Sequence, residues 1–307
     1  MRAIGVDIGG TKLAIGSVGH SGQLRDFELT PLPTKHYDRL IAHITARIAE
    51  LTDGSANRPA VGIAMAAWLS PDRGDVVSAV SLGWERRQLR QDLARSTGLH
   101  TVLHNDANAA AWGEYVLAGA PSEGAFVMLT LGTDVGGGVI CDGRLITGAS
   151  GLAGELGHLQ VDSTGPACVC GRRGCLAVYA SGKAILAGAV ERGRAAGLDT
   201  SAWTGPDVAA RANAGDTAVL TVIDDAARAI ALACGQLACV IDPHTVVLGG
   251  GASAIGDVLL DAVRKAVARI EPIGPVHPRP HISLARAGNR AGVLGAAELA
   301  VQPQPGL

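Results

Sequence analysis

Two short glycine-containing segments carry residues that could bind phosphate. Residues 7–12 read DIGGTK and residues 131–138 read LGTDVGGG. Backbone N–H groups in such turns can approach phosphate oxygens, Lys12 adds a cation, and Asp7 can hold Mg²⁺ directly or through water. Either segment alone also fits a hairpin turn that needs glycine for a positive φ. The residues predicted to bind phosphate in the two turns are Asp7, Gly9, Gly10, Thr11, Lys12, Gly132, Thr133 and Gly137.

A third glycine cluster follows a strand-like run in VVLGGGAS at 246–253. Gly250 and Gly251 there could lie against a nucleoside, or they could simply form a tight strand-to-helix turn. None of the three clusters is a Walker loop, because no GxxxxGK[ST] occurs, and no GxGxxG opens a helix as in a dinucleotide site. If these glycines bind a nucleotide, they do so in a site of another architecture.

A pair of polar residues begins an alanine-rich stretch in NDANAAAWGE at 105–114. Asn105 and Asp106 can cap the helix that follows, which is the structural alternative to a catalytic role. In a catalytic role, Asp106 accepts the proton of a substrate hydroxyl that attacks a γ-phosphate, and Asn105 binds a neighbouring hydroxyl. Because the carboxylate stands at a helix N-terminus, we expect it to stay ionised.

The third chemical signal is a set of potential metal ligands. CVCGRRGC at 168–175 follows GLAGELGHLQ at 151–160. His158 with Cys168, Cys170 and Cys175 forms a complete Cys3His set, which predicts a closed, structural Zn²⁺ site. Three reduced thiols beside an unrelated histidine are the alternative. Glu155 precedes His158 by three residues, so a zinc-anchored loop could direct its carboxylate toward a bound polyol.

The elements around these motifs predict an α/β protein of two similarly built lobes. A strand, a glycine turn and a second strand occur at residues 3–19 and again at 125–146, about 120 residues apart. Further strands are expected at 23–29, 60–66, 101–106 and 245–250, and helices at 37–51, 107–117, 181–196, 206–214, 216–241, 256–270 and 291–300. We expect an N-terminal lobe of residues 1–119, completed by the C-terminal helix 291–302, and a larger lobe of residues 120–290 with the zinc loop and the nucleotide site.

Composition restricts the classes of partner. The formal net charge of −2 provides no basic field for nucleic acid or anionic lipid. The longest apolar run, at 229–241, is too short to cross a bilayer, and the N-terminus lacks the features of a signal peptide. We therefore expect a cytoplasmic protein that binds a small molecule and neither nucleic acid nor membrane.

The order of these motifs resembles that of the ROK (repressor, open reading frame, kinase) sugar kinases, and the resemblance runs from Asp7 to about Gly295. The motifs that carry it are DIGGTK, NDANAAAWGE, LGTDVGGG, GLAGELGH, CVCGRRGC and LGGGAS. The family implies the two-lobed actin-like ATPase fold, related to ribonuclease H, with ATP, Mg²⁺ and sugar in a cleft between the lobes. It also implies closure on sugar binding and a homodimer or higher homo-oligomer.

The resemblance assigns roles to individual residues. Asp106 becomes the general base, and Asn105, Asp106, Glu155 and His158 contact sugar hydroxyls. His158 also joins the three cysteines on structural Zn²⁺. The implied activity is ATP-dependent phosphorylation of a hydroxyl of glucose or a similar hexose.

Three positions depart from the family pattern. AMAAWLSP at 64–71 replaces the usual Gly-x-Pro-Gly turn and places Trp68 near a sugar-facing loop. Asp134 stands in the second phosphate turn where glycine is common. Ala177 replaces a sugar-binding glutamate that lies two residues after the last zinc cysteine. The altered sugar half suggests a second hypothesis, a kinase for a sugar mimic such as a C7 cyclitol of the valiolone type.

Two non-catalytic hypotheses remain. A silent sugar sensor is disfavoured because Asp7, Asp106 and both phosphate turns are retained. A ROK repressor carries a helix-turn-helix domain before the first motif, whereas here that motif begins at residue 7, so a repressor is not expected.

Overall fold

The chain divides into two compact units by its internal contacts. The computed structural model describes residues 1–53, 58–72, 74–271 and 278–302. The first unit comprises Met1–Ala120, Leu145–Ala153 and Ala287–Leu307, and the second comprises Pro121–Arg144 and Gly154–Arg286. The division expected from the sequence, with residues 1–119 and 291–302 in one lobe and 120–290 in the other, differs in three places. Residue 120, residues 145–153 and residues 287–290 group with the first unit.

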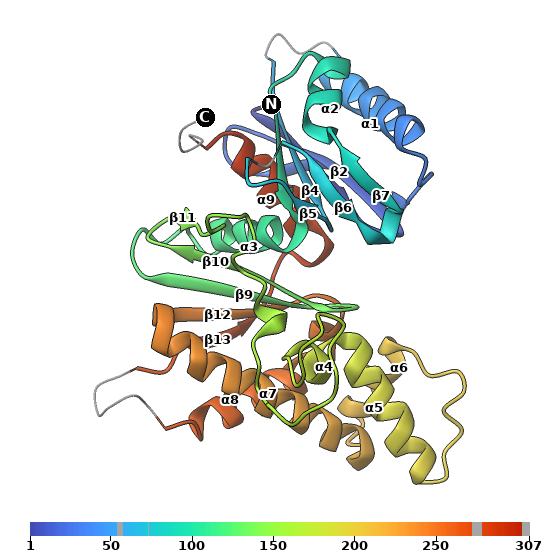
Figure 1. Cartoon of the computed structure of the whole chain (residues 1–307), viewed down its shortest axis with the longest axis vertical. Coiled ribbons are helices and arrows are strands. Elements are labelled where there is room, and N and C mark those ends of the chain that lie inside the picture. The colour runs from blue at the N-terminus through green and yellow to red at the C-terminus, as the bar shows by residue number, and fades with distance from the viewer. Residues whose placement is uncertain (54–57, 73, 272–277, 303–307) are drawn as a thin grey trace. The chain divides into compact units, whose positions relative to one another are not determined.

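The first unit is built on a mixed five-stranded sheet in the order β3-β2-β1-β4-β8, of which β2 and β4 are labelled in Figure 1. Strands β1, β2 and β3 are antiparallel neighbours, whereas β4 and β8 run parallel to β1. The strands are β1 (Ala3–Ile8), β2 (Lys12–Val18), β3 (Leu24–Pro31), β4 (Ala60–Met65) and β8 (Thr101–Asn105). Met65 pairs with Ile8 on one side and with Asn105 on the other, so the C-terminal ends of the three parallel strands share one edge.

Four helices accompany this sheet, namely α1 (Tyr37–Thr52), α2 (Leu89–Thr97), α3 (Asp106–Leu117) and α9 (Ala291–Ala300). All ten residues of α9 are buried, and this helix contacts β1, β4 and α3. Glycine makes the close approach possible, because a Cβ atom on Gly62 would lie 1.8 Å from the carbonyl oxygen of Ala296. A Cβ on Gly295 would likewise lie 1.7 Å from the carbonyl oxygen of Ala109. The sequence-distant α9 is thus part of the core of the first unit.

A small antiparallel sheet, β5-β6-β7, belongs to the same unit. Its strands are β5 (Trp68–Leu69), β6 (Val76–Ala79) and β7 (Trp84–Arg87), and the 3-10 helix η1 (Val80–Leu82) lies between the last two. Val76 and Trp84 are buried in the core of the unit, and the Trp84 indole donates a hydrogen bond of 2.7 Å to the carbonyl oxygen of Lys35. This anchoring fixes the small sheet on the rest of the unit.

The second unit repeats the plan of a hairpin beside a parallel strand. Its sheet has the order β11-β10-β9-β12-β13, in which β10 is antiparallel and β12 parallel to β9. The strands are β9 (Ala125–Leu131), β10 (Val135–Cys141), β11 (Arg144–Leu145), β12 (Pro243–Gly249) and β13 (His281–Leu284). The helices of this unit are α4 (Ala177–Ala180), α5 (Gly182–Ala195), α6 (Gly205–Asn213), α7 (Thr217–Ile241) and α8 (Asp257–Ala268). Its 3-10 helices are η2 (Leu156–His158) and η3 (Gly251–Ile255). A further 3-10 helix, η4 (Gly288–Arg290), belongs to the first unit.

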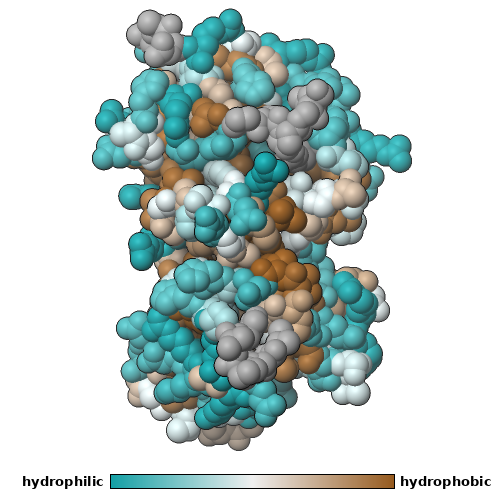
Figure 2. All heavy atoms as spheres, turned by 90° about the vertical axis from the view of Figure 1, so that its left-hand side faces the viewer, coloured by the Kyte–Doolittle hydropathy of each residue, from teal (hydrophilic) through white to brown (hydrophobic). Residues whose placement is uncertain are grey.

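The interiors of both units consist mainly of aliphatic side chains and alanine. The face drawn in Figure 2 is mostly hydrophilic, with smaller hydrophobic areas between the polar side chains. Among the residues that the structure describes, none of the helices has the length and apolar character needed to span a membrane.

All seven helices expected from the sequence are confirmed, with ends that differ by one or two residues. The sequence pattern did not predict α2, α4, the small sheet or β13. It also placed Gly136–Gly138 in a turn, which is wrong, because these residues lie within β10 and pair with β9. The short missed elements have little periodicity of their own and exist because they pack against larger neighbours.

Candidate functional site

The first glycine turn joins β1 and β2. Asp7 pairs with Ala14 near the end of β1, and the N–H of Gly9 donates a hydrogen bond of 2.9 Å to the carbonyl oxygen of Lys12. A Cβ atom on Gly10 would lie 2.8 Å from the Cβ of Ser81, so this glycine lets the turn pack against η1. Thr11 and Lys12 are exposed. The turn thus exposes the hydroxyl group of Thr11 and the ammonium group of Lys12, and its backbone is held in place by η1.

Asp7 lies against the first turn of α9. A Cβ atom on Gly292 would be 2.3 Å from Oδ2 of Asp7, so the carboxyl group occupies the space left by the missing side chain. Burial, and in second place the charge of Asp106, raises the pKa of Asp7 to about 7. Gly292 was not among the residues predicted from the sequence, because nothing in the sequence places residue 292 beside residue 7. A carboxyl group with a pKa near 7 is only partly ionised at neutral pH, and a nearby cation would favour its charged form.

Asn105 and Asp106 stand at the junction of β8 and α3. The Oδ1 atom of Asn105 accepts hydrogen bonds from the N–H groups of Ala107 and Asn108, at 3.0 and 3.1 Å. Asn105 is therefore the N-cap of α3, and its amide NH2 is the part that can donate to a ligand. Both the capping interpretation and a ligand-binding role are compatible with this geometry.

Asp106 is the first residue of α3, and its Oδ1 accepts the N–H of Ala107 at 2.9 Å. The place of this carboxyl at a helix N-terminus favours its ionised form, as expected from the sequence, but burial acts in the opposite direction. Burial raises the pKa of Asp106, and the opposing hydrogen bond from Ala107 only reduces the rise. Desolvation outweighs the helix terminus here, because a buried carboxylate loses more hydration than one N–H group returns. A raised pKa makes Asp106 a stronger proton acceptor once it is ionised.

The second glycine turn joins β9 and β10 through Gly132, Thr133 and Asp134. The N–H of Gly132 donates to the carbonyl oxygen of Asp134 at 2.9 Å, and the side chain of Asp134 accepts the N–H of Val135 at 2.8 Å. Asp134 therefore supports the turn from within, and its replacement of glycine requires no left-handed backbone. Thr133 is exposed. The N–H of Gly182, which begins α5, donates to the carbonyl oxygen of Gly132 at 2.7 Å.

Gly137, Gly250 and Gly251 occupy three different environments. Gly137 lies within β10, and a Cβ there would be 2.6 Å from the side chain of Leu156, so its small size is explained by packing. Gly250 has a φ of 80° and lies against the backbone of Leu131, next to the second turn. Gly251 is exposed, and a Cβ atom added there would have no neighbour within 4 Å. The structure thus brings the second and third glycine segments together on one side of the second unit.

The four potential metal ligands converge in the second unit. The metal-binding atoms of His158, Cys168, Cys170 and Cys175 all lie within 4.8 Å of one another. The Sγ atom of Cys168 is 3.6 Å from Nδ1 of His158, and the Sγ atoms of Cys170 and Cys175 are 3.6 Å apart. Tetrahedral Zn²⁺ with bonds of about 2.1 Å to nitrogen and about 2.3 Å to sulfur separates its ligands by roughly 3.6–3.8 Å. The donor set and its spacing therefore fit a structural Zn²⁺.

The protonation of the cysteines follows from their surroundings. Hydrogen bonding from the backbone of Arg172 lowers the pKa of the exposed Cys170 thiol to about 6, whereas burial raises the pKa of Cys175. The loop itself is held by backbone hydrogen bonds of 2.8 Å from Cys168 to Arg172 and 3.0 Å from Gly171 to Cys168. Cys170 thus offers a thiolate at neutral pH in a loop that already has the required shape.

The segment that carries Glu155 and His158 packs on the second hairpin. A Cβ atom on Gly157 would lie 2.0 Å from the carbonyl oxygen of Val135, and Leu156 covers Gly137. Glu155 is exposed, and His158 is half-buried. The ligand histidine and the candidate sugar-binding glutamate are therefore positioned by direct contact with β10.

Ala177 begins the short helix α4, two residues after Cys175, and is buried. It belongs to the same hydrophobic cluster as Leu176 and Ala180. The position therefore provides a methyl group beside the zinc loop, where the family resemblance leads one to expect a carboxylate.

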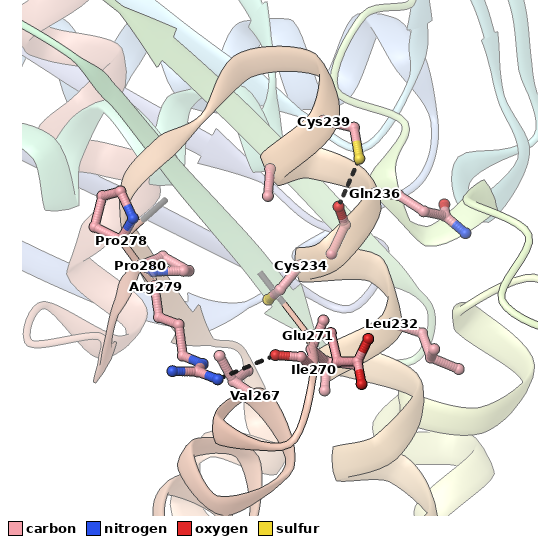
Figure 3. Close-up of a pocket in the computed structure, with 13 residues that line it drawn as sticks. Leu232, Cys234, Gln236, Cys239, Val267, Ile270, Glu271, Pro278, Arg279 and Pro280 are labelled. Atoms are coloured by element: carbon pink, nitrogen blue, oxygen red, sulfur yellow. Dashed lines mark hydrogen bonds between the residues drawn. The ribbon is translucent and has the colours of Figure 1, made fainter. Parts of the chain in front are cut away.

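A separate pocket of about 340 Å³ lies between α7 and the segment after α8 (Figure 3). Its lining is mostly apolar and includes Leu232, Val267 and Ile270. Arg279 lies at its side and donates a hydrogen bond of 3.2 Å to the carbonyl oxygen of Ile270. None of the residues predicted from the sequence lines this pocket, so it does not enter the candidate site.

The fold and these groups define a class of protein: a two-lobed α/β protein with the actin-like arrangement, glycine turns on repeated hairpins and a Cys3His loop. The ROK family model matches residues 3–303, and the chain belongs to the ROK family.

Full-length relatives support this assignment. The chain is 35% identical over 313 residues to a glucokinase of Streptomyces coelicolor, with 98% of each chain covered. It is 36% identical over 301 residues to an N-acetylmannosamine kinase of Citrobacter koseri, with 98% of this chain and 99% of that one covered. The resemblance to ROK sugar kinases that the motifs carry is thereby confirmed.

A solved structure confirms the fold. A ROK family glucokinase from Streptomyces griseus, crystallised in complex with glucose and AMPPNP, has a TM-score of 0.84 and 33% identity to this chain. The match covers 99% of this chain and 100% of the other. The two-lobed fold expected from the motifs is therefore correct.

Proposed function

We propose that this protein is an ATP-dependent kinase that phosphorylates a hydroxyl group of glucose or a closely related hexose. The observation that carries the proposal is that Asp7 and Asp106 both stand at the edge of the sheet where β1, β4 and β8 end, near enough for the charge of Asp106 to raise the pKa of Asp7. Ligands of α/β proteins bind at this kind of edge. The full-length similarity to glucokinases supports the choice of substrate class.

In the proposed reaction, a sugar hydroxyl oxygen attacks the γ-phosphorus of ATP. The new oxygen–phosphorus bond forms as the bond to the β–γ bridging oxygen breaks, and ADP leaves. The Oδ1 atom of Asp106 is engaged by Ala107, so the other carboxylate oxygen accepts the hydroxyl proton. The amide of Asn105 donates a hydrogen bond to a neighbouring hydroxyl, and Glu155 and His158 bind further hydroxyls.

The phosphates are bound by backbone N–H groups and hydroxyls of the glycine turns, with Gly250 and Gly251 on the nucleoside side. Lys12 adds a positive charge from the exposed start of β2. Asp7 is the residue that would hold Mg²⁺, which supplies charge neutralisation on the phosphates when it is bound. Structural Zn²⁺ on His158 and the three cysteines would keep the segment from Glu155 to His158 in place.

A coupled assay of ADP release tests the proposal. With ATP and Mg²⁺, the protein is expected to turn over glucose or N-acetylmannosamine with a kcat/KM well above the background ATPase rate. A protein that binds a sugar but releases no ADP with any hexose, amino sugar or cyclitol would instead be the silent sensor.

Ala177 favours a second candidate substrate, a C7 cyclitol of the valiolone type phosphorylated on its exocyclic primary hydroxyl. A methyl group cannot accept a hydrogen bond, so a hydroxyl aimed at position 177 would lose about 1–3 kcal/mol if it were buried without a partner. A ring with a different substituent there avoids that cost. The deciding measurement is kcat/KM for glucose against the cyclitol, with Ala177→Glu in parallel. Efficient use of glucose by the wild type and no effect of Ala177→Glu would eliminate the cyclitol.

We also propose a homodimer or higher homo-oligomer, by analogy with the family. Light scattering coupled to size-exclusion chromatography measures the mass directly. A mass of about 31 kDa at micromolar concentration, equal to that of one chain, would contradict it.

A further inference from the structure

Trp68 is unusual among the tryptophans of this chain because its side chain is largely in solvent. It is 63% exposed, whereas Trp84 and Trp112 are 4% and 5% exposed. Aromatic residues make up only 3% of the sequence, so the large apolar side chains are few. An indole left outside the core forgoes the burial that stabilises the other two.

The fold places Trp68 close to the proposed reacting groups. Strand β4 ends at Met65, which pairs with Ile8 of β1 and with Asn105 of β8. The N–H of Ala67 then donates a hydrogen bond of 2.9 Å to the carbonyl oxygen of Met65, so the chain turns at once. Trp68 follows as the first residue of β5, and β5 contacts β8, the strand that leads into Asp106. The indole therefore begins at the same sheet edge as Asp7 and Asp106.

The backbone beneath the indole is fixed. Trp68 pairs with Ser78 of β6, and the N–H of Ser70 donates to the carbonyl oxygen of Asp75 at 2.9 Å. Ala67, immediately before it, is buried in the core of the first unit. The same small sheet leads into η1, where Ser81 supports Gly10 of the first phosphate turn. An exposed ring on a fixed strand is suited to contacting a ligand, because little order has to be gained on binding.

We propose that the indole of Trp68 is a specificity-determining wall of the acceptor site and packs against the C–H face of the substrate ring. This inference rests on the proposed kinase function and names a residue that distinguishes ring-shaped acceptors from open-chain polyols. The axial C–H groups on one side of a pyranose or cyclitol ring form a flat apolar surface that fits an aromatic face. An open-chain polyol lacks that surface and gains little from the contact.

Three variants test the proposal: Trp68→Ala, Trp68→Phe, and Trp203→Phe as the matched control. Trp203 lies in the second unit, where its ring is stacked 3.9 Å from the guanidinium of Arg211. If the indole packs against the substrate ring, Trp68→Ala should raise the KM of the best hexose by roughly three- to tenfold. The KM of ATP should change less than twofold, the effect on sorbitol should be small, and Trp68→Phe should recover most of the loss.

Intrinsic fluorescence provides a readout independent of turnover. Titration with the hexose is expected to change the emission of the wild type and of Trp203→Phe, but not that of Trp68→Phe, whose remaining tryptophans include the buried Trp84 and Trp112. Circular dichroism and Tm serve as folding controls, and both should be nearly unchanged because residue 68 is exposed.

The outcomes separate the two proposals. An unchanged hexose KM in Trp68→Ala, with the fluorescence change retained in Trp68→Phe, would contradict the proposed role of Trp68. It would not affect the proposed kinase function. Equal losses for hexose and sorbitol would also contradict the role of Trp68, because the effect would not depend on a ring. If the wild type phosphorylates no polyol, the proposed function fails, and a sugar-dependent signal lost only in Trp68→Phe would still support the wall.

Discussion

The two hairpins that carry the glycine turns have the same topology but different support. In each, two antiparallel strands lie beside a parallel third strand, β4 for the first hairpin and β12 for the second. The first turn has a buried carboxyl, Asp7, backed by α9 at Gly292. The second turn has an exposed Asp134 and is backed by the loop with Glu155–His158 and by Gly182 of α5.

This difference separates two ways of supporting a glycine turn. The first hairpin is stabilised by helix packing and by a small sheet, which are part of the hydrophobic core. The second hairpin also lies in a hydrophobic core, and an irregular loop that includes His158, one of the four potential metal ligands, packs on it in addition. Changes to the metal ligands should therefore affect the second hairpin first, whereas changes around Asp7 should affect the chemistry of the first.

The largest expected effect comes from the first unit, at Asp106. Asp106→Asn should keep the fold and nucleotide binding but lower kcat by roughly 100- to 10,000-fold, because an amide cannot accept the hydroxyl proton. Steady-state kinetics and calorimetry with AMPPNP measure the two properties. Asp216→Asn is the matched control, since Asp216 also begins a helix by accepting N–H groups and asparagine can do the same. Retention of most of kcat in Asp106→Asn would remove Asp106 from its role as the base.

The next effect tests the metal dependence of the second hairpin. Cys170→Ser should lose the single Zn²⁺ per chain, lower Tm by roughly 5 °C or more and weaken sugar binding. Elemental analysis, thermal unfolding and calorimetry check these three results. Cys239→Ser is the control, because Cys239 is an exposed cysteine on α7 outside the cluster. Freshly purified wild type without stoichiometric zinc would contradict the structural-metal assignment.

The buried carboxyl of the first hairpin predicts a pH dependence. With a pKa of about 7 for Asp7, kcat/KM should fall about tenfold between pH 8 and pH 6, because the protonated acid cannot hold Mg²⁺. Stability should change in the opposite direction. The folded-state pKa lies above that of the unfolded chain, so the contribution of Asp7 is fully present below about 3.8 and is lost as pH rises through about 7.

Thermal unfolding of the ligand-free wild type and of Asp7→Asn from about pH 3 to about pH 8, the range that spans both pKa values, tests the sign. The wild type should lose stability relative to the variant as pH rises. Parallel pH profiles for the two proteins would show that Asp7 titrates at its ordinary value.

The smallest effect concerns the contact behind Asp7. Gly292→Ala would place a methyl group 2.3 Å from Oδ2 of Asp7, so the carboxyl or the helix must shift at a cost of about 1–3 kcal/mol. The KM of Mg²⁺ should rise several-fold. Gly205→Ala is the control, because residue 205 opens α6 with no atom within 4 Å of the added methyl group, and it should be neutral or slightly stabilising. Equal Tm values for the two variants would argue against a close contact.

Motifs with a strong local cause were predictable from the sequence. The spacing of His158 and the three cysteines predicted a cluster because few other arrangements satisfy a closed Zn²⁺ shell, and the ligand atoms do converge. The long helices were predicted from their apolar periodicity and their polar N-caps, as at Asp216 of α7. The small sheet was not predicted, because strands of two to four residues have too little pattern to be distinguished from turns.

What the sequence by itself determined is the family of the chain and the order of its motifs, and with them the candidate site residues. Only the tertiary structure decided the burial, the pKa shifts and the packing contacts of these residues. The rise in the pKa of Asp106 depends on the protein around it, since desolvation is a property of the surrounding atoms and not of the neighbours in sequence. Gly292 contacts Asp7 only because α9, near the end of the chain, packs in the first unit. The packing there is so close that the carboxyl group of Asp7 fits only because residue 292 has no Cβ atom.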